Sequence, residues 1–183
     1  MEVRFDEGVG DADASNATRK EQNFLLNNFG VSNYLKVTNG KVKYKIPIEE
    51  YQRIRTTSVV NPAADSMMLG KFTPTIENSI VNWSKPGPDS YIVKAGKTST
   101  YFNLGSEWGK IQEKFGLTDI EMFEFFNKPA LDDAFASGKT IQFSHNPLDF
   151  PDSFLYYEWE YIKSKFKITD NNLTEMGGIW YVK

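Results

Sequence analysis

The feature that most constrains the fold is the order of strand and helix patterns after Asn61-Pro62. Short apolar or β-branched runs alternate with helical spacing, in the order strand, helix, strand, helices, strand, helix, strand. This alternation is typical of an α/β layer, in which helices cover a largely parallel sheet. The sequence therefore predicts an α/β fold, with a mostly parallel sheet of about four strands flanked by helices.

The elements of this layer have recognisable boundaries. In the segment 75–83, Ile76, Ile80 and Trp83 recur at helical spacing, which predicts a helix there. The segment Tyr91-Ile-Val is compatible with either a helix or a strand. The expected strands are 66–69, 99–102, 140–143 and 179–182, and the other expected helices are 106–115, one starting at 118, 129–137 and 153–166.

A separate module is expected before this layer. Residues 1–16 are acidic and rich in small residues, which is typical of a flexible leader, and a helix should end near Gly30. Asn39-Gly40, flanked by alternating β-formers, predicts a β-hairpin with a type I′ turn. A short helix should follow over 48–55. We therefore expect an N-terminal leader with a small helix and hairpin module over 1–60, and an α/β domain over 61–183.

Composition excludes several kinds of chemistry. The chain has no cysteine, so disulfides, thiolate zinc sites and a cysteine nucleophile are excluded. A single histidine excludes metal sites that need two, although it leaves a carboxylate-held Mg²⁺ open. No apolar run approaches the ~20 residues that span a bilayer. We expect no metal, no cofactor and no stable membrane insertion.

Charge argues against a strongly basic surface for nucleic acids. The formal net charge is −3, and from residue 61 onward 12 Lys stand against 16 Asp and Glu. Proteins that bind nucleic acid through its phosphates usually present a basic face. This distribution counts against a nuclease unless basic charge gathers locally.

Three polar turns follow expected strands. They are Gly70-Lys71, Asn103-Leu104-Gly105 and Ser144-His145-Asn146. The carboxyl ends of parallel strands meet at one edge of a sheet, which is where ligands bind in α/β folds. We therefore expect these three turns to share an edge, with Lys139, which precedes its strand, at the opposite end.

His145 and Lys71 are the main catalytic candidates. Imidazole has a reference pKa of ~6.5, which suits a general acid or base, although a turn histidine bonded to backbone is an equal reading. Lys71 would hold a phosphate or an oxyanion, against the alternative of an ordinary surface lysine. A serine hydrolase is disfavoured, because no nucleophile elbow surrounds a serine here.

Weaker candidates come from hydroxyls and carboxylates. Thr98 and Thr100, near Gly96-Lys97, are candidates for hydrogen bonds to a substrate. Asp132 and Glu158 are most simply solvated helix residues, but either would also be able to orient His145 or to bind a metal.

Scattered matches resemble the C-terminal toxin domains of bacterial polymorphic toxins, including the contact-dependent growth inhibition proteins of filamentous haemagglutinin type. The matches lie within 61–183. They are Ala64-Asp65, Leu69-Gly70-Lys71, Thr100-Tyr101-Phe102, Trp108, Asn127, Leu131-Asp132, Gly138-Lys139, Ser144-His145-Asn146-Pro147, Glu158-Trp159-Glu160-Tyr161 and Trp180-Tyr181.

The resemblance implies a domain at the end of a large secreted or cell-surface adhesin. It would be delivered into a neighbouring bacterium, would act in the cytoplasm of that cell and would be neutralised in the producer by a cognate immunity protein. Residues 1–60 would belong to a delivery module. The Val-Glu-Asn-Asn boundary motif common in such proteins is absent from this chain.

Three functions follow from these readings. The first is an RNase acting on tRNA or other RNA, with His145 as general acid or base on a ribose 2′-hydroxyl and Lys71 stabilising the phosphorane. A host-cell protein that presents the RNA would offset the acidic charge. Asn103, Ser144 and Asn146 would position this substrate.

The second function is cleavage of NAD or transfer of ADP-ribose, with Glu158 or Asp132 stabilising an oxocarbenium-like centre. The third is a non-enzymatic binding domain. A pocket at the strand ends favours an enzyme, and a flat apolar patch favours a binding domain.

Overall fold

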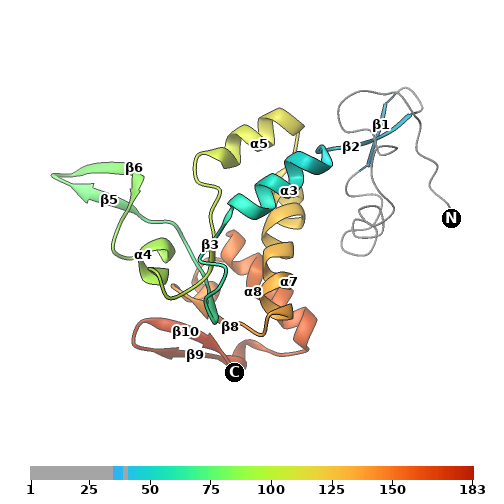
Figure 1. Cartoon of the computed structure of the whole chain (residues 1–183). Coiled ribbons are helices and arrows are strands. Elements are labelled where there is room, and N and C mark those ends of the chain that lie inside the picture. The colour runs from blue at the N-terminus through green and yellow to red at the C-terminus, as the bar shows by residue number, and fades with distance from the viewer. Residues whose placement is uncertain (1–34, 39–40) are drawn as a thin grey trace. The chain divides into compact units, whose positions relative to one another are not determined.

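A computed structural model describes residues 35–38 and 41–183 of the chain. The expected leader, the helix ending near Gly30 and the Asn39-Gly40 turn lie outside these residues. The chain divides into two compact units, each built from two segments. The first comprises Met1–Ser58 and Leu104–Pro129, and the second comprises Val59–Asn103 and Ala130–Lys183 (Figure 1). Residues 104–129, which the sequence analysis placed in the later domain, are thus grouped with the first unit.

The first unit is held together by an aromatic contact between its two segments. Tyr51, in the segment before Ser58, donates a buried hydrogen bond of 2.8 Å from its hydroxyl to the carbonyl of Phe125. Its ring also packs against Phe126 at 5.6 Å between centroids. Within the described residues, this unit contains β1 (Leu35–Thr38), β2 (Lys41–Tyr44), α3 (Ile48–Thr57), α5 (Glu107–Phe115), α6 (Asp119–Met122) and the π-helical turn η2 (Phe123–Asn127).

The two strands of the expected hairpin are present, and so are the helices expected over 48–55, over 106–115 and from 118. Strands β1 and β2 pair antiparallel. Helix α6 begins with a capping box, in which the Thr118 hydroxyl accepts from the Glu121 amide and the Glu121 carboxylate accepts from the Thr118 amide. A capping box gives partners to two backbone N–H groups that a helix start otherwise leaves unsatisfied.

The second unit is a mixed α/β unit. Its strands are β3 (Val59–Val60), β4 (Ser66–Leu69), β5 (Pro74–Glu77), β6 (Ile80–Pro86), β7 (Tyr101–Phe102), β8 (Thr140–Phe143), β9 (Leu173–Met176) and β10 (Ile179–Val182). Its helices are α4 (Tyr91–Ala95), α8 (Phe154–Phe166) and the greater part of α7 (Lys128–Ala136), with 3-10 turns η3 (Pro147–Asp149) and η4 (Asp170–Asn172).

The central sheet has four strands in the order β4-β8-β10-β9. Only β4 and β8 run parallel, whereas β10 is antiparallel to both β8 and β9. The expectation of a mostly parallel sheet was therefore wrong. The physical reason is the Gly177-Gly178 turn, where both residues have positive φ, because such a two-residue turn joins antiparallel strands.

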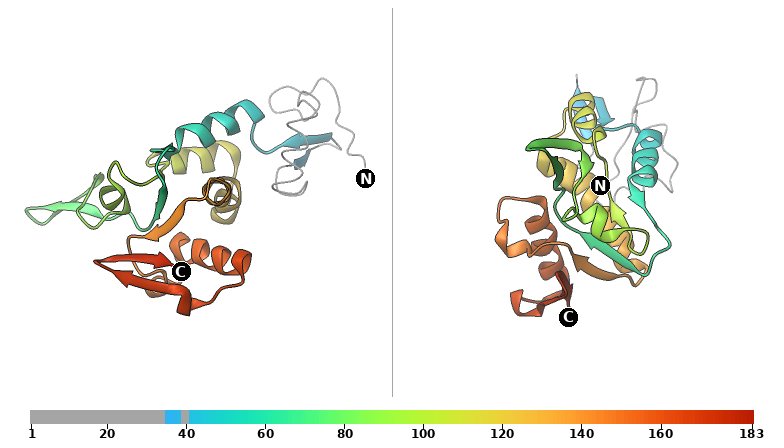
Figure 2. Two further views of the ribbon diagram at one scale, coloured as in Figure 1. Left: turned by 60° about the horizontal axis from the view of Figure 1, so that its bottom comes forward. Right: turned by 90° about the vertical axis from the view of Figure 1, so that its left-hand side faces the viewer.

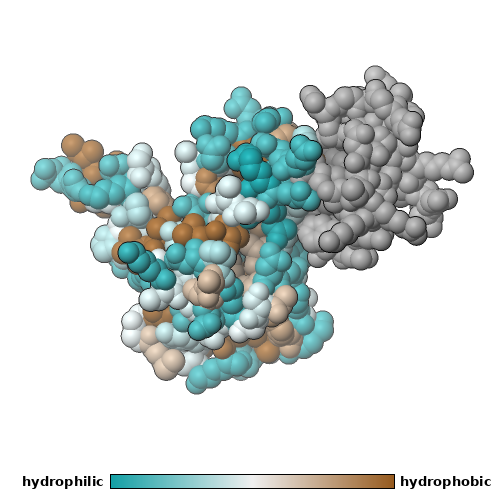
Figure 3. Space-filling view, viewed as in Figure 1, coloured by the Kyte–Doolittle hydropathy of each residue, from teal (hydrophilic) through white to brown (hydrophobic). Residues whose placement is uncertain are grey.

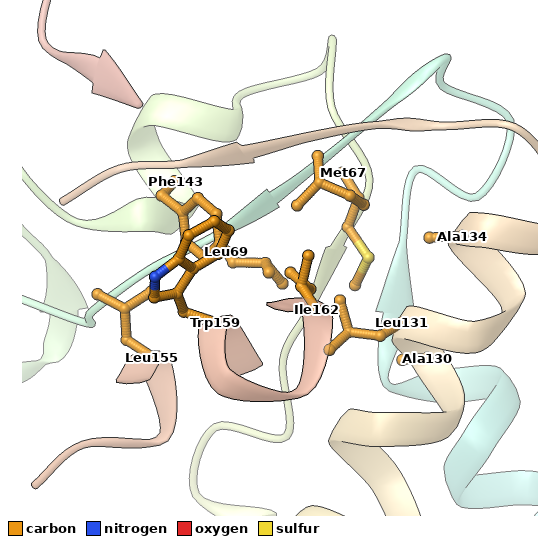
Figure 4. Packing of buried hydrophobic residues seen from close by; sticks show 10 residues of the cluster. Met67, Leu69, Ala130, Leu131, Ala134, Phe143, Leu155, Trp159 and Ile162 are labelled. Atoms are coloured by element: carbon orange, nitrogen blue, oxygen red, sulfur yellow. The ribbon is translucent and has the colours of Figure 1, made fainter. Parts of the chain in front are cut away.

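One face of this sheet carries the core. Figure 4 shows Met67, Leu69 and Phe143 of the sheet meeting residues of α7 and α8. Phe143 packs edge-on against Trp159 of α8, with 5.8 Å between ring centroids. The hairpin β9–β10 and α8 lie side by side in both views of Figure 2. The rest of the cluster consists of Ala130, Leu131, Ala134, Ile141, Leu155 and Ile162.

The helix expected over 75–83 does not exist. This segment forms the antiparallel hairpin β5–β6, which turns at Asn78 and Ser79, both with positive φ. Ile76, Ile80 and Trp83 are 67%, 70% and 69% exposed, so their spacing does not mark a buried helix face. Figure 3 shows apolar side chains on the surface of this hairpin. The segment from Tyr91, which the sequence left open, is helical.

Candidate functional site

Two of the three polar turns meet at the ends of β4 and β8. These strands are parallel neighbours, with Leu69 opposite Phe143. The amide of Ser144 donates to the carbonyl of Leu69 at 2.8 Å, so Gly70-Lys71 and Ser144-His145 leave the sheet together. The expectation of a shared edge is confirmed for these two turns.

The turn at Asn103 is joined to this edge through Tyr91 of α4. The Tyr91 amide donates to the carbonyl of Lys71 at 3.1 Å. Its hydroxyl donates to the carbonyl of Phe102, next to Asn103, at 2.8 Å. Strand β7 approaches β4 through a parallel bridge between Thr100 and Met67. Helix α4 thus ties the ends of β4 and β7 together.

Gly70 allows this edge to close. A Cβ built on Gly70 would lie 2.7 Å from Cβ of Tyr91 and 2.9 Å from Cβ of Ser144, and closer still to the Ser144 hydroxyl. Cβ atoms do not approach other carbons so closely in folded proteins. Only glycine fits between the two side chains.

His145 is held by its neighbour in the chain. Ser144 Oγ lies 2.7 Å from His145 Nδ1, at hydrogen-bond distance. Ser144 is 2% exposed, whereas the imidazole is half-buried, with its ring edge-on to Phe150 at 5.8 Å. Either atom can be the donor in this hydrogen bond. In the tautomer in which Nδ1–H donates to Ser144 Oγ, Nε2 carries no proton and is the nitrogen that can accept one from a substrate.

Two lysines, Lys71 and Lys94, lie near this imidazole. The Nζ atom of Lys71 lies 3.9 Å from the centroid of the Phe150 ring. Lys94 Nζ donates to the carbonyl of Ser144 at 2.9 Å, and lies 3.9 Å from Asp89. Within the described residues, no carboxylate lies within ion-pair distance of Lys71.

These surroundings lower the pKa of His145 below its usual value. Burial is the largest cause, followed by the positive charge of Lys94, and Lys71 acts in the same direction. The carboxylate of Asp89 opposes them. Because each of the lowering effects disfavours the charged form, the imidazole is neutral near pH 7 and able to accept a proton.

Glu158 is buried on α8 and lies near Tyr91. The hydroxyl of Tyr91 has its pKa raised by burial first, and then by the negative charges of Glu158 and Tyr101. Tyr91 therefore stays protonated at all ordinary pH values. The negative charge of Glu158 thus acts on Tyr91, while the positive charges of Lys94 and Lys71 act on His145.

Some predicted site residues have local structural roles. The side chain of Asn146 caps η3, accepting from the Leu148 amide at 3.1 Å and donating to Asp149 at 3.2 Å. The Thr100 hydroxyl is buried and donates to the carbonyl of Asn61 at 2.7 Å. The Thr98 hydroxyl donates to the carbonyl of Ala95 at 3.3 Å.

The residues from Thr98 to Thr100 lie toward the start of β4. The Thr100 amide donates to the carbonyl of Ser66, and the hydroxyls of Ser66 and Ser99 are 2.8 Å apart. Since Ser66 begins β4, this cluster lies at the end of the strand opposite Gly70. The structure therefore does not bring Thr98 and Thr100 together with His145.

Two further residues lie apart from the edge. Asp132 of α7 accepts from the Tyr161 hydroxyl at 2.6 Å and pairs with Lys165, both on α8. Lys139 donates to the carbonyls of Pro62 and Ala64, before β4 begins. Lys139 is thus at the opposite end from His145, as expected.

Sequence reasoning missed Lys94, Asp89 and Phe150. Tyr91 and Lys94 are three residues apart, a spacing that places both on one side of a helix. That signal was hidden because the helix has only five residues and its pattern also suits a strand.

Comparisons with protein-family models, with curated proteins and with solved structures found no match to this chain. Among the described residues, no three His, Asp or Glu side chains gather in a way that would hold a metal ion. No helix in the described ranges has the length and apolar character needed to span a membrane.

Proposed function

We propose that the second unit cleaves RNA, with His145 as the general base and Lys71 as the cation that stabilises the reacting phosphate. One observation carries the proposal. The only imidazole of the chain is half-buried at a strand-end edge, hydrogen-bonded through Nδ1, with its pKa lowered by burial and by two ammonium groups. Phosphate transesterification needs a neutral base that accepts the proton of the nucleophile and a cation that stabilises the charge on the phosphate.

The reaction follows from these groups. Nε2 of His145 takes the proton of a ribose 2′-hydroxyl, and the 2′-oxygen attacks the adjacent phosphorus. The bond between phosphorus and the 5′-oxygen breaks, the 5′-oxygen takes a proton from water, and a 2′,3′-cyclic phosphate remains. The imidazolium returns its proton to solvent. Lys71 stabilises the negative charge that develops on the phosphoryl oxygens.

Local charge relieves the objection raised by the acidic composition. Lys71 and Lys94 act together on His145, while the opposing Asp89 is 78% exposed and screened by solvent. Two ammonium groups therefore act on His145 although the chain as a whole is negative. An anionic backbone is a better match to this edge than a neutral substrate.

Ser144 is the obvious rival as a nucleophile, because its hydroxyl lies 2.7 Å from the imidazole. A nucleophile must reach its substrate, but Ser144 is 2% exposed and Gly70 packs against it. We therefore assign Ser144 to orienting the ring. Asn103, at the end of β7, remains a candidate for holding the substrate.

The biological role that we propose is that of a toxin domain. The resemblance to polymorphic toxin tips supports delivery into a neighbouring bacterium, action on tRNA or other RNA in its cytoplasm, and neutralisation by a cognate immunity protein. Residues 1–60 would serve delivery. A host-cell protein that presents the RNA would be a further partner.

Cleavage of NAD or transfer of ADP-ribose is the second candidate. The observation that favours it is the burial of Glu158 near Tyr91, because a buried carboxylate is able to stabilise an oxocarbenium-like centre. Asp132 is a weaker choice, since it already pairs with Lys165.

The test uses the purified chain and three substrates of one sequence: RNA, DNA, and DNA with a single ribose. The proposal predicts cleavage of the RNA, cleavage of the chimera only after its ribose, and a 2′,3′-cyclic phosphate detected by mass spectrometry. His145→Ala should lower the rate by about 100- to 10,000-fold. Lys71→Ala should also lower it, whereas Lys97→Ala, an exposed lysine in the Thr98 region, should not. Cleavage of plain DNA, or consumption of NAD with intact RNA, would overturn the proposal.

A further inference from the structure

Lys94 is the one charged side chain that reaches the His145 turn from α4. Its ammonium donates to the carbonyl of Ser144 at 2.9 Å, across 50 positions of sequence. That carbonyl belongs to the peptide bond between Ser144 and His145. A hydrogen bond from a charged donor is stronger than one between neutral groups, so this contact holds the peptide on which the imidazole depends.

Helix α4 presents Lys94 from an anchored position. Tyr91 fixes the start of the helix to the carbonyls of Lys71 and Phe102. Ala95, next to Lys94, is fully buried. The side chain of Lys94 itself is only 24% exposed. The Lys94 ammonium is therefore held in place by the protein itself, without a substrate. A positioning group has to be preorganised in this way.

The charged and titratable groups around the imidazole come from several elements. Helix α4 supplies Lys94 and Tyr91, the loop before it supplies Asp89, and the turn after β4 supplies Lys71. Helix α8 supplies Glu158, whose charge acts on Tyr91, and the turn of His145 itself carries Asp149. Of these groups, Lys94 is the one bonded directly to the backbone beside His145.

We propose that Lys94 is a positioning residue of this site: its ammonium fixes the Ser144 carbonyl, and with it the peptide that carries the imidazole, and it places a second positive charge beside the ring. Loss of Lys94 would then loosen the turn and let the imidazole hold its proton more tightly. The catalytic consequence rests on the proposed RNA cleavage, but the effect on the imidazole does not.

The protonation test uses the fact that the chain contains one histidine. Its ring protons give a single set of signals in the proton NMR spectrum of the whole chain, and their shift against pH gives the pKa directly. The wild-type titration midpoint should lie below 6.5. Lys94→Met should raise it, because the substitution removes a positive charge that disfavours the protonated ring. Lys94→Arg should keep it near the wild-type value, and the matched control Lys97→Met should not move it.

Asp89→Asn provides a second variant, in which the substituted side chain is exposed rather than largely buried. Asp89 is 78% exposed, so its substitution should not disturb folding. Its carboxylate opposes Lys94 at 3.9 Å, so its removal should lower the midpoint further. A folded Lys94→Met protein with an unchanged midpoint would overturn the proposal. If Lys94→Met does not fold, Lys94→Gln also removes the charge while keeping a polar end on the side chain, and a folded Lys94→Gln protein with an unchanged midpoint would likewise overturn the proposal.

The catalytic consequence is read from the pH dependence of RNA cleavage. Lys94→Met should lower kcat and move the acidic limb of the kcat/KM profile to higher pH by the same amount as the NMR midpoint. If the rate falls but the acidic limb of the profile stays at the same pH, the proposal that the charge of Lys94 acts on the ring would be wrong. If the wild-type chain does not cleave RNA, the proposed function fails, while the NMR titration still decides the role of Lys94.

Discussion

The backbone of Gly70 packs directly against the side chain of Ser144. A Cβ on Gly70 would lie 2.9 Å from Cβ of Ser144 and 2.7 Å from Cβ of Tyr91. The absence of a side chain at this position lets β4, β8 and α4 converge. The candidate site lies where these three elements meet. Lys71 comes shortly after β4, His145 comes shortly after β8, and Lys94 belongs to α4.

Gly70→Ala should therefore damage both stability and activity. The added methyl group meets a short serine side chain and the Cβ atom of a partly buried tyrosine, neither of which can move aside easily. Such overpacking costs about 1–3 kcal/mol, measured by urea unfolding, and RNA cleavage should fall with it. Gly109→Ala is the matched control, since a Cβ there has nothing within 4 Å and alanine in a helix gains about 0.5–1 kcal/mol over glycine. A Gly70→Ala protein with wild-type stability and rate would contradict this account of the edge.

Ser144→Ala should lower the rate of RNA cleavage by about tenfold, without abolishing it. A hydrogen bond to the ring is worth about 0.5–1.5 kcal/mol net, which corresponds to a factor of about ten or less. The substitution removes no more than the hydroxyl that orients Nδ1. Single-turnover cleavage by Ser144→Ala and by His145→Ala measures the difference. Equal and complete loss in both variants would instead identify Ser144 as a nucleophile.

The lowered pKa of His145 predicts a dependence of stability on pH. The imidazole has a lower pKa in the folded chain than in the unfolded chain, where it is about 6.5. Below pH 6.5 the unfolded state binds more protons, so the free energy of unfolding falls until the pH is below the folded-state pKa. Urea unfolding at pH 7.5 and pH 5 should show a smaller loss for His145→Gln than for the wild type. An equal loss in the two proteins would show that the folded imidazole titrates normally.

The exposed apolar residues of β5–β6 should contribute little to folding. Ile76 and Ile80 are 67% and 70% exposed, and substitutions at such positions usually change stability by less than about 0.5 kcal/mol. Ile76→Thr and Ile80→Thr should stay within that range in urea unfolding. Leu131→Ala, in the core, should cost about 2–5 kcal/mol. A large loss in either isoleucine variant would mean that the hairpin packs against other residues.

The sequence predicted the strand Thr140–Phe143 and its polar turn correctly. Alternating residues face the core, and Asn146-Pro147 ends the pattern with turn chemistry. The segment 75–83 was misread because a spacing of four and three residues also arises on a hairpin that exposes its apolar side chains. The periodicity of a sequence shows where its apolar residues lie, but it does not show whether those residues are buried. A helix was predicted on the assumption that they are. At Ile76 and Ile80 that assumption fails.

The sheet and the site show a similar limit. Alternating strands and helices indicate layers, but they do not fix the direction of the last strand, which Gly177-Gly178 reverses. The pairing of β4 with β8 made Lys71 and His145 neighbours, as expected from strand ends. The role of Lys94 was not predictable from the sequence, because its contact with the Ser144 carbonyl spans 50 positions and depends on the tertiary placement of α4.

The most direct test of the central claim is the state of total RNA in bacteria that briefly express the chain. RNA from these cells is run on a denaturing gel beside RNA from cells expressing His145→Ala at the same level. The account predicts discrete tRNA or rRNA fragments with the wild-type chain and none with the variant. Intact RNA in cells that nevertheless stop growing would contradict it, and fragments with both proteins would remove His145 from the chemistry.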